Sequence, residues 1–220
     1  MQPVIFDFNG TMFLDTDKNE KAWRQLMQEV AGIELTADDF KNYLHGSPDV
    51  EIVKHFINPA MSLTEARRLS CQKEELYRKL CLADKAHLKL TDGLPDYLDY
   101  LVAHNIPHNI ATGADLDNLE FYLQYLNLAH WFNPEKIIFS DGSFTGKPAP
   151  DIYLLAAKKI NIEITDCLIF EDAYLGVKAA AAAGVRKIIG LCAIPENNFL
   201  KTMPEVAETI TNFINWKKFA

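Results

Sequence analysis

The feature that most constrains the fold is a short apolar run at the start of the chain with no candidate partner strand near it. The run Val4–Phe6 consists of strand-forming residues, meets an acid at Asp7 and turns at Asn9-Gly10. The following residues, 18–89, predict one helix after another and no convincing strand. The partners of the first strand must therefore lie in the second half of the chain, which predicts a helical insertion between them.

Apolar spacing and capping residues predict the helices of this insertion. In the first helix, Trp23, Leu26, Met27 and Val30 share one face, and Gly32 ends the pattern. The later helices are predicted over residues 36–44 with Thr36 as N-cap, 49–56, and 63–82 with Ser62 as N-cap.

From residue 90 onward, strand and helix alternate. Strands are predicted at residues 108–112, 137–139, 167–170 and, as the last strand, 187–191. Helices are predicted from Pro95, around Leu119 to Leu126, and over residues 151–160, 175–183 and 204–216. This alternation predicts an α/β fold with a parallel, doubly wound sheet. We expect a core of residues 1–14 and 90–220, and a helical cap of residues 15–89 that acts as a lid above the carboxyl ends of the strands.

Composition excludes some classes of partner. Lys and Arg number 22 against 30 Asp and Glu, a net charge of −8, which argues against a nucleic-acid surface. Four dispersed cysteines without a Cys-x-x-Cys pair favour a reduced chain. No basic segment opens the chain, and no apolar run approaches the ~20 residues of a membrane span. We therefore expect a cytoplasmic protein that does not bind membranes.

Acidic side chains follow two of the predicted strands. Asp7 ends the first strand, and Glu171 and Asp172 end the strand at 167–170. The carboxyl ends of parallel strands meet at one edge of the sheet, where ligands bind. An aspartate there can attack phosphorus, and carboxylates together suit Mg²⁺. Taken singly, Asp7 fits a turn and Glu171-Asp172 a helix N-terminus; their joint placement favours a site.

Groups suited to holding a phosphate follow the other strands. Thr112, before Gly113, offers a hydroxyl and accessible N–H groups, and Lys147 offers a positive charge between stiffening prolines. Alone, Thr112 fits a turn and Lys147 a solvated surface. Together with the carboxylates they provide what phosphoryl transfer needs, which is positioning and electrostatic stabilisation.

The motifs Gly-Lys-Pro-Ala-Pro-Asp at 146–151 and Phe-Glu-Asp-Ala at 170–173, with the first strand and its Asp7, resemble the haloacid dehalogenase superfamily of hydrolases. The resemblance covers nearly the whole chain and is closest to the capped, β-phosphoglucomutase-like phosphatases. It implies a Rossmann-like core, dependence on Mg²⁺ and an aspartyl-phosphate intermediate.

The resemblance also implies roles for individual residues. It makes Asp7 the nucleophile and a metal ligand, Asp172 with Glu171 the other metal carboxylates, and Asn9 a ligand through its backbone carbonyl. Thr11, Thr112, Gly113 and Lys147 would hold the phosphate. The substrate would be a small phosphorylated metabolite, and a cap loop at His45, Gly46 and Ser47 would contact it. Monomer and homodimer both stay open.

One position departs from the family pattern. Family phosphatases carry a second aspartate where this chain has Asn9. A carboxamide cannot donate or accept the proton that this aspartate moves, so acid-base help typically worth about 10²–10⁴ in rate is missing. Four explanations stay open: a natural variant for good leaving groups, another reaction such as a phosphomutase or phosphonate hydrolase, a phospho-ligand-binding protein without catalysis, or an engineered replacement. The Asn9-Gly10 pair is also prone to deamidation.

Overall fold

The chain forms two compact units in the computed structural model, which describes residues 2–45 and 47–220. The first unit, the sheet unit, comprises Met1–Leu14 and Lys89–Ala220; the second, the helical unit, comprises Asp15–Leu88.

The two segments that join the units are fastened to each other inside the sheet unit. Phe13 forms an antiparallel bridge with Leu90, and the Thr91 N–H donates to the Met12 carbonyl over 2.8 Å. The Thr91 hydroxyl also donates to the Thr11 carbonyl over 2.8 Å. The chain therefore leaves the sheet unit and returns to it at the same place.

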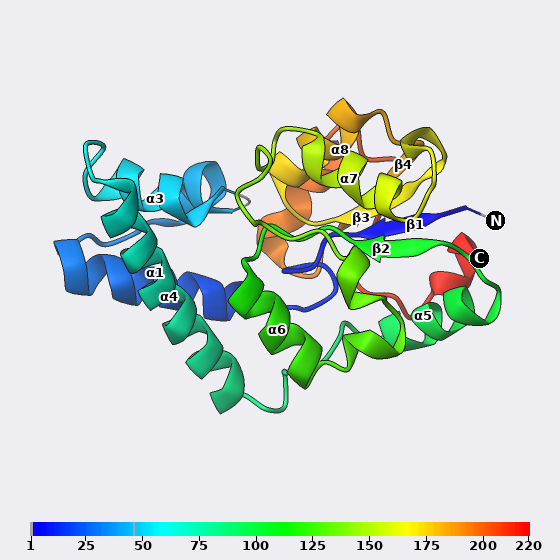
Figure 1. The fold of residues 1–220 in the computed structure, drawn as a ribbon, viewed down its shortest axis with the longest axis horizontal. Helices are drawn as coiled ribbons and strands as arrows, with labels where there is room; N and C mark the ends of the chain where they lie inside the picture. Colours follow the sequence, from blue (N-terminus) through cyan, green and yellow to red (C-terminus); the bar gives the residue numbers. More distant parts are fainter. Residues whose placement is uncertain (1, 46) are drawn as a thin grey trace. The chain divides into compact units, whose positions relative to one another are not determined.

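Five parallel strands in the order β2-β1-β3-β4-β5 form the core of the sheet unit (Figure 1). They are β1 (Val4–Phe6), β2 (His108–Ile110), β3 (Leu168–Glu171), β4 (Lys187–Leu191) and β5 (Glu208–Ile210). Phe6 lies opposite Ile110 on one side and Phe170 on the other, so β1 and β2 end level and β3 runs one residue further. The segments that follow them leave from one edge of the sheet. The predicted α/β class with a parallel sheet is confirmed.

Helices cover both faces of this sheet (Figure 1). They are α5 (Leu94–Ala103), α6 (Leu116–Tyr125), α7 (Asp151–Lys159) and α8 (Tyr174–Ala183). Side chains alternate along β1, so Ile5 packs with α7 and α8 residues such as Tyr153 and Val177. Phe6 points to the other face and packs in an aromatic cluster with Phe170 and Phe213. Burial on both faces explains why β1 is continuously apolar.

The helical unit contains α1 (Thr16–Ala31), α2 (Ala37–Asp39), the π-helix η1 (Phe40–Leu44), α3 (Asp49–Phe56) and α4 (Leu63–Ala83). Three predicted ends are confirmed. The Ser62 side chain accepts the Glu65 N–H, Thr36 forms a capping box with Asp39, and Gly32 ends α1 in the left-handed region with φ 65°.

Two predicted elements are wrong. Residues 137–139 form only a single bridge, between Ile138 and Ala111, instead of a strand. The helix predicted over residues 204–216 is absent from the described chain, and β4 is not the last strand. Short 3-10 helices, η5 (Pro195–Thr202) and η6 (Trp216–Phe219), flank β5 there instead.

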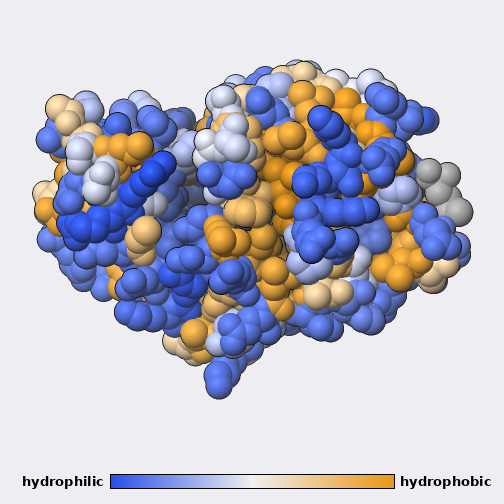
Figure 2. Space-filling view, in the orientation of Figure 1, coloured by the Kyte–Doolittle hydropathy of each residue, from blue (hydrophilic) through white to orange (hydrophobic). Residues whose placement is uncertain are grey.

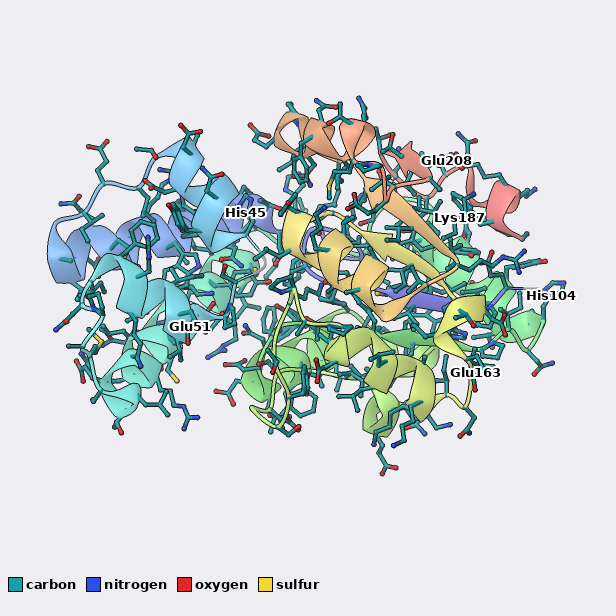
Figure 3. All side chains as sticks on the ribbon, turned by 90° about the horizontal axis from the view of Figure 1, so that it is seen from above. His45, Glu51, His104, Glu163, Lys187 and Glu208 are labelled. Carbon is teal, nitrogen blue, oxygen red and sulfur yellow. The ribbon has the colours of Figure 1, made fainter. Side chains whose placement is uncertain are left out.

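The edge strand β5 forms because one edge of β4 is available for pairing and because this segment contains β-branched residues. The Cys192 N–H donates to the Ile210 carbonyl over 2.7 Å, and Thr209 lies opposite Gly190. Lys187 and Glu208, which open the two strands, form an ion pair at 3.7 Å (Figure 3). Pairing with an existing sheet outweighs the local helical pattern.

Surface hydropathy, cysteine state and helix composition complete the description of the fold. Hydrophilic residues cover much of the visible face of each unit, with apolar side chains grouped on the sheet unit (Figure 2). All four cysteines are free thiols. None of the helices in the described ranges combines the length and apolar composition that a membrane crossing requires.

Candidate active site

Lys147 joins the first strand to the third at the carboxyl edge of the sheet. Its ammonium Nζ donates to Asp7 Oδ1 over 2.6 Å and to Glu171 Oε2 over 2.7 Å. Only 8% of Lys147 and 5% of Asp7 are exposed. Burial favours the neutral amine, but the charges of Asp7 and Glu171 outweigh it and raise the pKa of Lys147. The lysine is therefore a fixed positive charge beside the Asp7 carboxylate.

Glu171 is fully buried, and both of its oxygens accept hydrogen bonds. Oε2 accepts from Lys147 and from the Tyr153 hydroxyl on α7, whereas Oε1 accepts the N–H groups of Asp172 and Ala173 over 3.1 and 2.9 Å. A carboxylate held by four donors has little capacity left for a metal ion. Glu171 lies beside the other two carboxylates, but its contacts are those of a group that holds Lys147.

Asp172 is held from two directions. The Thr11 hydroxyl donates to its Oδ1 over 3.2 Å, and the Asn197 amide donates to its Oδ2 over 3.3 Å. Asn197 lies in η5, the next element after β4, and the Cys192 thiol donates to its carbonyl over 3.2 Å. The Asp172 carboxylate is thus fixed in place next to Asp7.

Burial and nearby negative charge raise the pKa values of Asp7 and Asp172. Burial first, and then the Glu171 charge, raise the pKa of Asp7 to about 7 against the opposing effect of Lys147. Burial and the charges of Asp7 and Glu171 likewise raise the pKa of Asp172. With all three acids ionised, their negative charge would exceed the one positive charge of Lys147, and the raised pKa values reflect this.

The residues present fit a divalent cation. One carboxylate oxygen each of Asp7, Glu171 and Asp172 lies within 4.8 Å of the others. Among the described residues, the buried Asp7 Oδ2 has no hydrogen-bond donor, although an unpaired buried oxygen is unfavourable. A hard cation such as Mg²⁺ would satisfy this oxygen and balance the excess charge.

Asn9 lies in a network of hydroxyl groups. Its amide Nδ2 donates to the Tyr122 hydroxyl over 2.7 Å, and its Oδ1 accepts from the Thr112 hydroxyl over 3.3 Å. Thr112 accepts the Ala114 N–H over 3.1 Å, so its proton is available to Asn9. Phe8 stacks on the Tyr122 ring at 4.4 Å between ring centroids. The amide is therefore oriented by contacts within the sheet unit.

The structure brings together most of the residues predicted for the site. Those grouped at the sheet edge are Asp7, Asn9, Thr11, Thr112, Lys147, Glu171 and Asp172. Thr11 is fully buried against Asp172, a contact that the sequence did not indicate. Gly113 directly follows Thr112 and is exposed.

The predicted substrate loop belongs to the helical unit. His45 Nε2 pairs with Glu20 Oε1 at 3.1 Å, and the Ser47 N–H donates to the Leu44 carbonyl over 3.2 Å. Gly46 lies outside the described residues. Substrate contact by this loop stays a prediction.

Three contributors to the site were not predicted: Tyr122, Tyr153 and Asn197. Asn197 carries a weak signal that sequence reasoning could have used, because it is a polar residue in η5, the element that comes next after β4. Tyr153 comes two residues after the Gly-Lys-Pro-Ala-Pro-Asp motif, on the buried side of α7. Tyr122 looks like an ordinary apolar position of α6, and only the fold reveals its contact with Asn9.

Comparisons with known proteins identify the family. The haloacid dehalogenase-like hydrolase family matches residues 1–184. Fructose-1-phosphate phosphatase YqaB of Escherichia coli K12 is 31% identical over 183 residues, which is 83% of this chain and 92% of that protein. Named phosphatases among the relatives confirm the predicted class of enzyme, a phosphoric monoester hydrolase.

Solved structures are consistent with this family assignment. A family IA, variant 3 hydrolase of the same superfamily from Entamoeba histolytica is 36% identical, with a TM-score of 0.87 over 98% of this chain and 95% of that one. The β-phosphoglucomutase of Clostridium difficile, at 22% identity, shares the fold, with a TM-score of 0.79 over 98% and 92% of the two chains. The chain therefore belongs to the haloacid dehalogenase-like hydrolase family.

Proposed function

We propose that this chain is a Mg²⁺-dependent phosphatase of a small phosphorylated metabolite, with Asp7 as nucleophile. The observation that carries the proposal is the Lys147 ammonium 2.6 Å from a buried Asp7 whose other oxygen lacks a donor among the described residues. Such a carboxylate is fixed in position and lies beside a positive charge that attracts a phosphate. A relative that acts on fructose 1-phosphate supports a phosphorylated sugar or a similar small molecule as substrate.

In this proposal Asp7, Asp172 and the Asn9 backbone carbonyl hold Mg²⁺, which when bound neutralises charge on the phosphate. Lys147 binds a phosphate oxygen, and Glu171 with Tyr153 holds the lysine in place. Thr112, Gly113 and Thr11 belong to the proposed phosphate site. The Asp7 carboxylate attacks phosphorus, and the leaving oxygen departs as the new bond to Asp7 forms.

Asn9 decides which substrates react readily. Its amide cannot protonate a leaving oxygen. Phosphates whose leaving group is stable as an anion should therefore react well, and alkyl phosphates poorly. The same substitution favours a second candidate, a protein that binds phosphorylated ligands without turning them over.

The proposal extends to cellular context. Free thiols throughout support a cytoplasmic location, and we propose a monomer or homodimer. His45 and Ser47 are proposed to contact the part of the substrate beyond its phosphate.

Turnover of p-nitrophenyl phosphate with Mg²⁺ separates the two candidates, because p-nitrophenolate leaves without a proton. We expect turnover by the wild-type protein, with loss of activity on chelation and in the Asp7→Asn variant. A folded wild-type protein that binds phosphate but releases no p-nitrophenol would establish the binding protein instead.

A further inference from the structure

The two halves of the proposed reaction differ in their need for a base. In the first, a bond forms between Asp7 oxygen and phosphorus and the bond to the leaving oxygen breaks; an aryl oxyanion then leaves without a proton. In the second, water oxygen bonds to phosphorus and the bond to Asp7 breaks. Asp7 leaves as a stable carboxylate, but the water must give up a proton to a base.

The charged neighbours of Asp7 are poorly placed to take this proton. The Lys147 ammonium is a hydrogen-bond donor to both Asp7 and Glu171, so it offers no free lone pair for a proton. Glu171 already accepts four hydrogen bonds, two on each oxygen. Asp172 accepts from Thr11 and Asn197 and belongs to the proposed metal site.

The neutral neighbours are no better. The Asn9 amide is not a base at any relevant pH, and the Thr112 hydroxyl is a donor to it. Two histidines of the sheet unit lie away from the carboxyl edge of the sheet. His108 is the first residue of β2, at the opposite edge, and both of its ring nitrogens are hydrogen-bonded to backbone carbonyls. His104 caps the C-terminus of α5 at that opposite edge (Figure 3). Among the described residues of the sheet unit, none that contacts Asp7 is therefore a free base.

We propose that the acyl phosphate on Asp7 breaks down more slowly than it forms, so that phosphorylated enzyme accumulates during turnover. This inference rests on the proposed function, since it takes Asp7 as the nucleophile. It assigns the slow step to water attack for any substrate whose leaving group needs no proton. The predominant form of the working enzyme then carries a phosphoryl group on Asp7.

The variant Asn9→Asp tests the inference that the missing base slows hydrolysis of the acyl phosphate. Aspartate has nearly the same shape as asparagine, and the hydroxyl groups of Tyr122 and Thr112 can both donate to a carboxylate. The substitution therefore supplies a base while both hydroxyl groups can stay hydrogen-bonded to residue 9. Asn133→Asp makes the same chemical change at an exposed turn, where the side chain accepts the Glu135 N–H, and serves as control.

The experiment is rapid mixing of the protein with p-nitrophenyl phosphate and Mg²⁺, after peptide mass spectrometry has established that Asn9 is intact. We expect a burst of p-nitrophenol close to one equivalent per protein, followed by a slower steady release. Acid-quenched protein should gain the mass of one phosphoryl group on the peptide that contains Asp7. Asn9→Asp should abolish the burst and raise the steady rate about 10²-fold, whereas Asn133→Asp should keep the wild-type pattern.

The possible results of this experiment distinguish the slow-hydrolysis inference from the proposed phosphatase function. Steady turnover without a burst and without phosphorylated protein would overturn the slow-hydrolysis inference while leaving the phosphatase proposal intact. A burst of equal size in wild type and Asn9→Asp would also overturn it. Absence of any p-nitrophenol from the folded protein would overturn the proposed function itself.

Discussion

At the scale of single residues, two glycines make room for the site carboxylates. A Cβ atom on Gly10 would overlap the Asp172 carboxylate, and Gly10 also has a φ of +78°, which other residues rarely adopt. A Cβ atom on Gly176 would overlap the Glu171 carboxylate. Both carboxylates are thus packed directly against backbone, which limits the positions that they can take.

Residues at the sheet edge could be predicted because the carboxyl ends of parallel strands lie along the same edge of the sheet, independently of the loop conformations. Asp7 and Asp172 needed only that rule and their chemistry, because each directly follows a strand of the sheet. The partners that orient them could not be predicted. Tyr153 depends on which face α7 turns to the sheet, and Asn197 depends on the path of a 3-10 segment.

Asn197→Ala tests whether the partner of Asp172 matters for metal binding. Loss of the amide frees one Asp172 oxygen, and loss of a group that orients a ligand typically weakens metal binding about 10–100-fold. Calorimetric titration with Mg²⁺ should show a decrease of this size. The neighbouring Asn198→Ala removes an exposed amide that donates to the Pro195 carbonyl and not to Asp172, and this variant should bind Mg²⁺ like wild type. Equal affinities in both variants would contradict the role.

At the scale of elements, helices with caps were predictable and the C-terminal segment was not. Ser62, Thr36 and Gly32 mark helix ends through local contacts, so the sequence alone carries the signal. Residues 204–216 carry apolar side chains at Val206, Ile210, Phe213 and Ile214, a spacing that also suits a helix. Their actual structure depends on the free edge of β4 and on the aromatic cluster, which are distant in sequence.

Phe213→Ala tests this account of the C-terminal segment. Phe213 is fully buried, 4.9 Å from Phe170 and 6.3 Å from Tyr97 between ring centroids. Removing a buried phenyl ring should lower the free energy of unfolding by about 3–5 kcal/mol, measured by urea denaturation. Its neighbour Ile214 is 62% exposed, so Ile214→Ala should change stability by less than about 0.5 kcal/mol. Similar effects in both variants would contradict the assigned packing.

At the scale of the whole molecule, the sequence indicated a sheet domain interrupted by a helical block because periodicity changes at its borders. The structure describes two compact units, with the joining segments fastened at Phe13 and Leu90. Substrate choice could not be predicted, because no general rule of the fold says which substrate the proposed contacts of His45 and Ser47 would select.

The central claim is that Asp7 and Asp172 hold a divalent cation beside Lys147, and that a phosphate binds to this assembly. A ligand that binds only the folded state raises its stability, by about 2.7 kcal/mol at 100 times the Kd. Asp172→Asn removes one charge of the proposed metal site, whereas Asp166→Asn removes an exposed charge in the same unit, before β3 begins.

The most direct test is the thermal unfolding temperature with Mg²⁺, with inorganic phosphate, and with both. We predict that Mg²⁺ raises the Tm of the wild-type protein, that phosphate raises it further only when Mg²⁺ is present, and that Asp172→Asn loses both effects while Asp166→Asn keeps them. A Tm unaffected by Mg²⁺, or a phosphate effect of the same size without the metal, would contradict the claim.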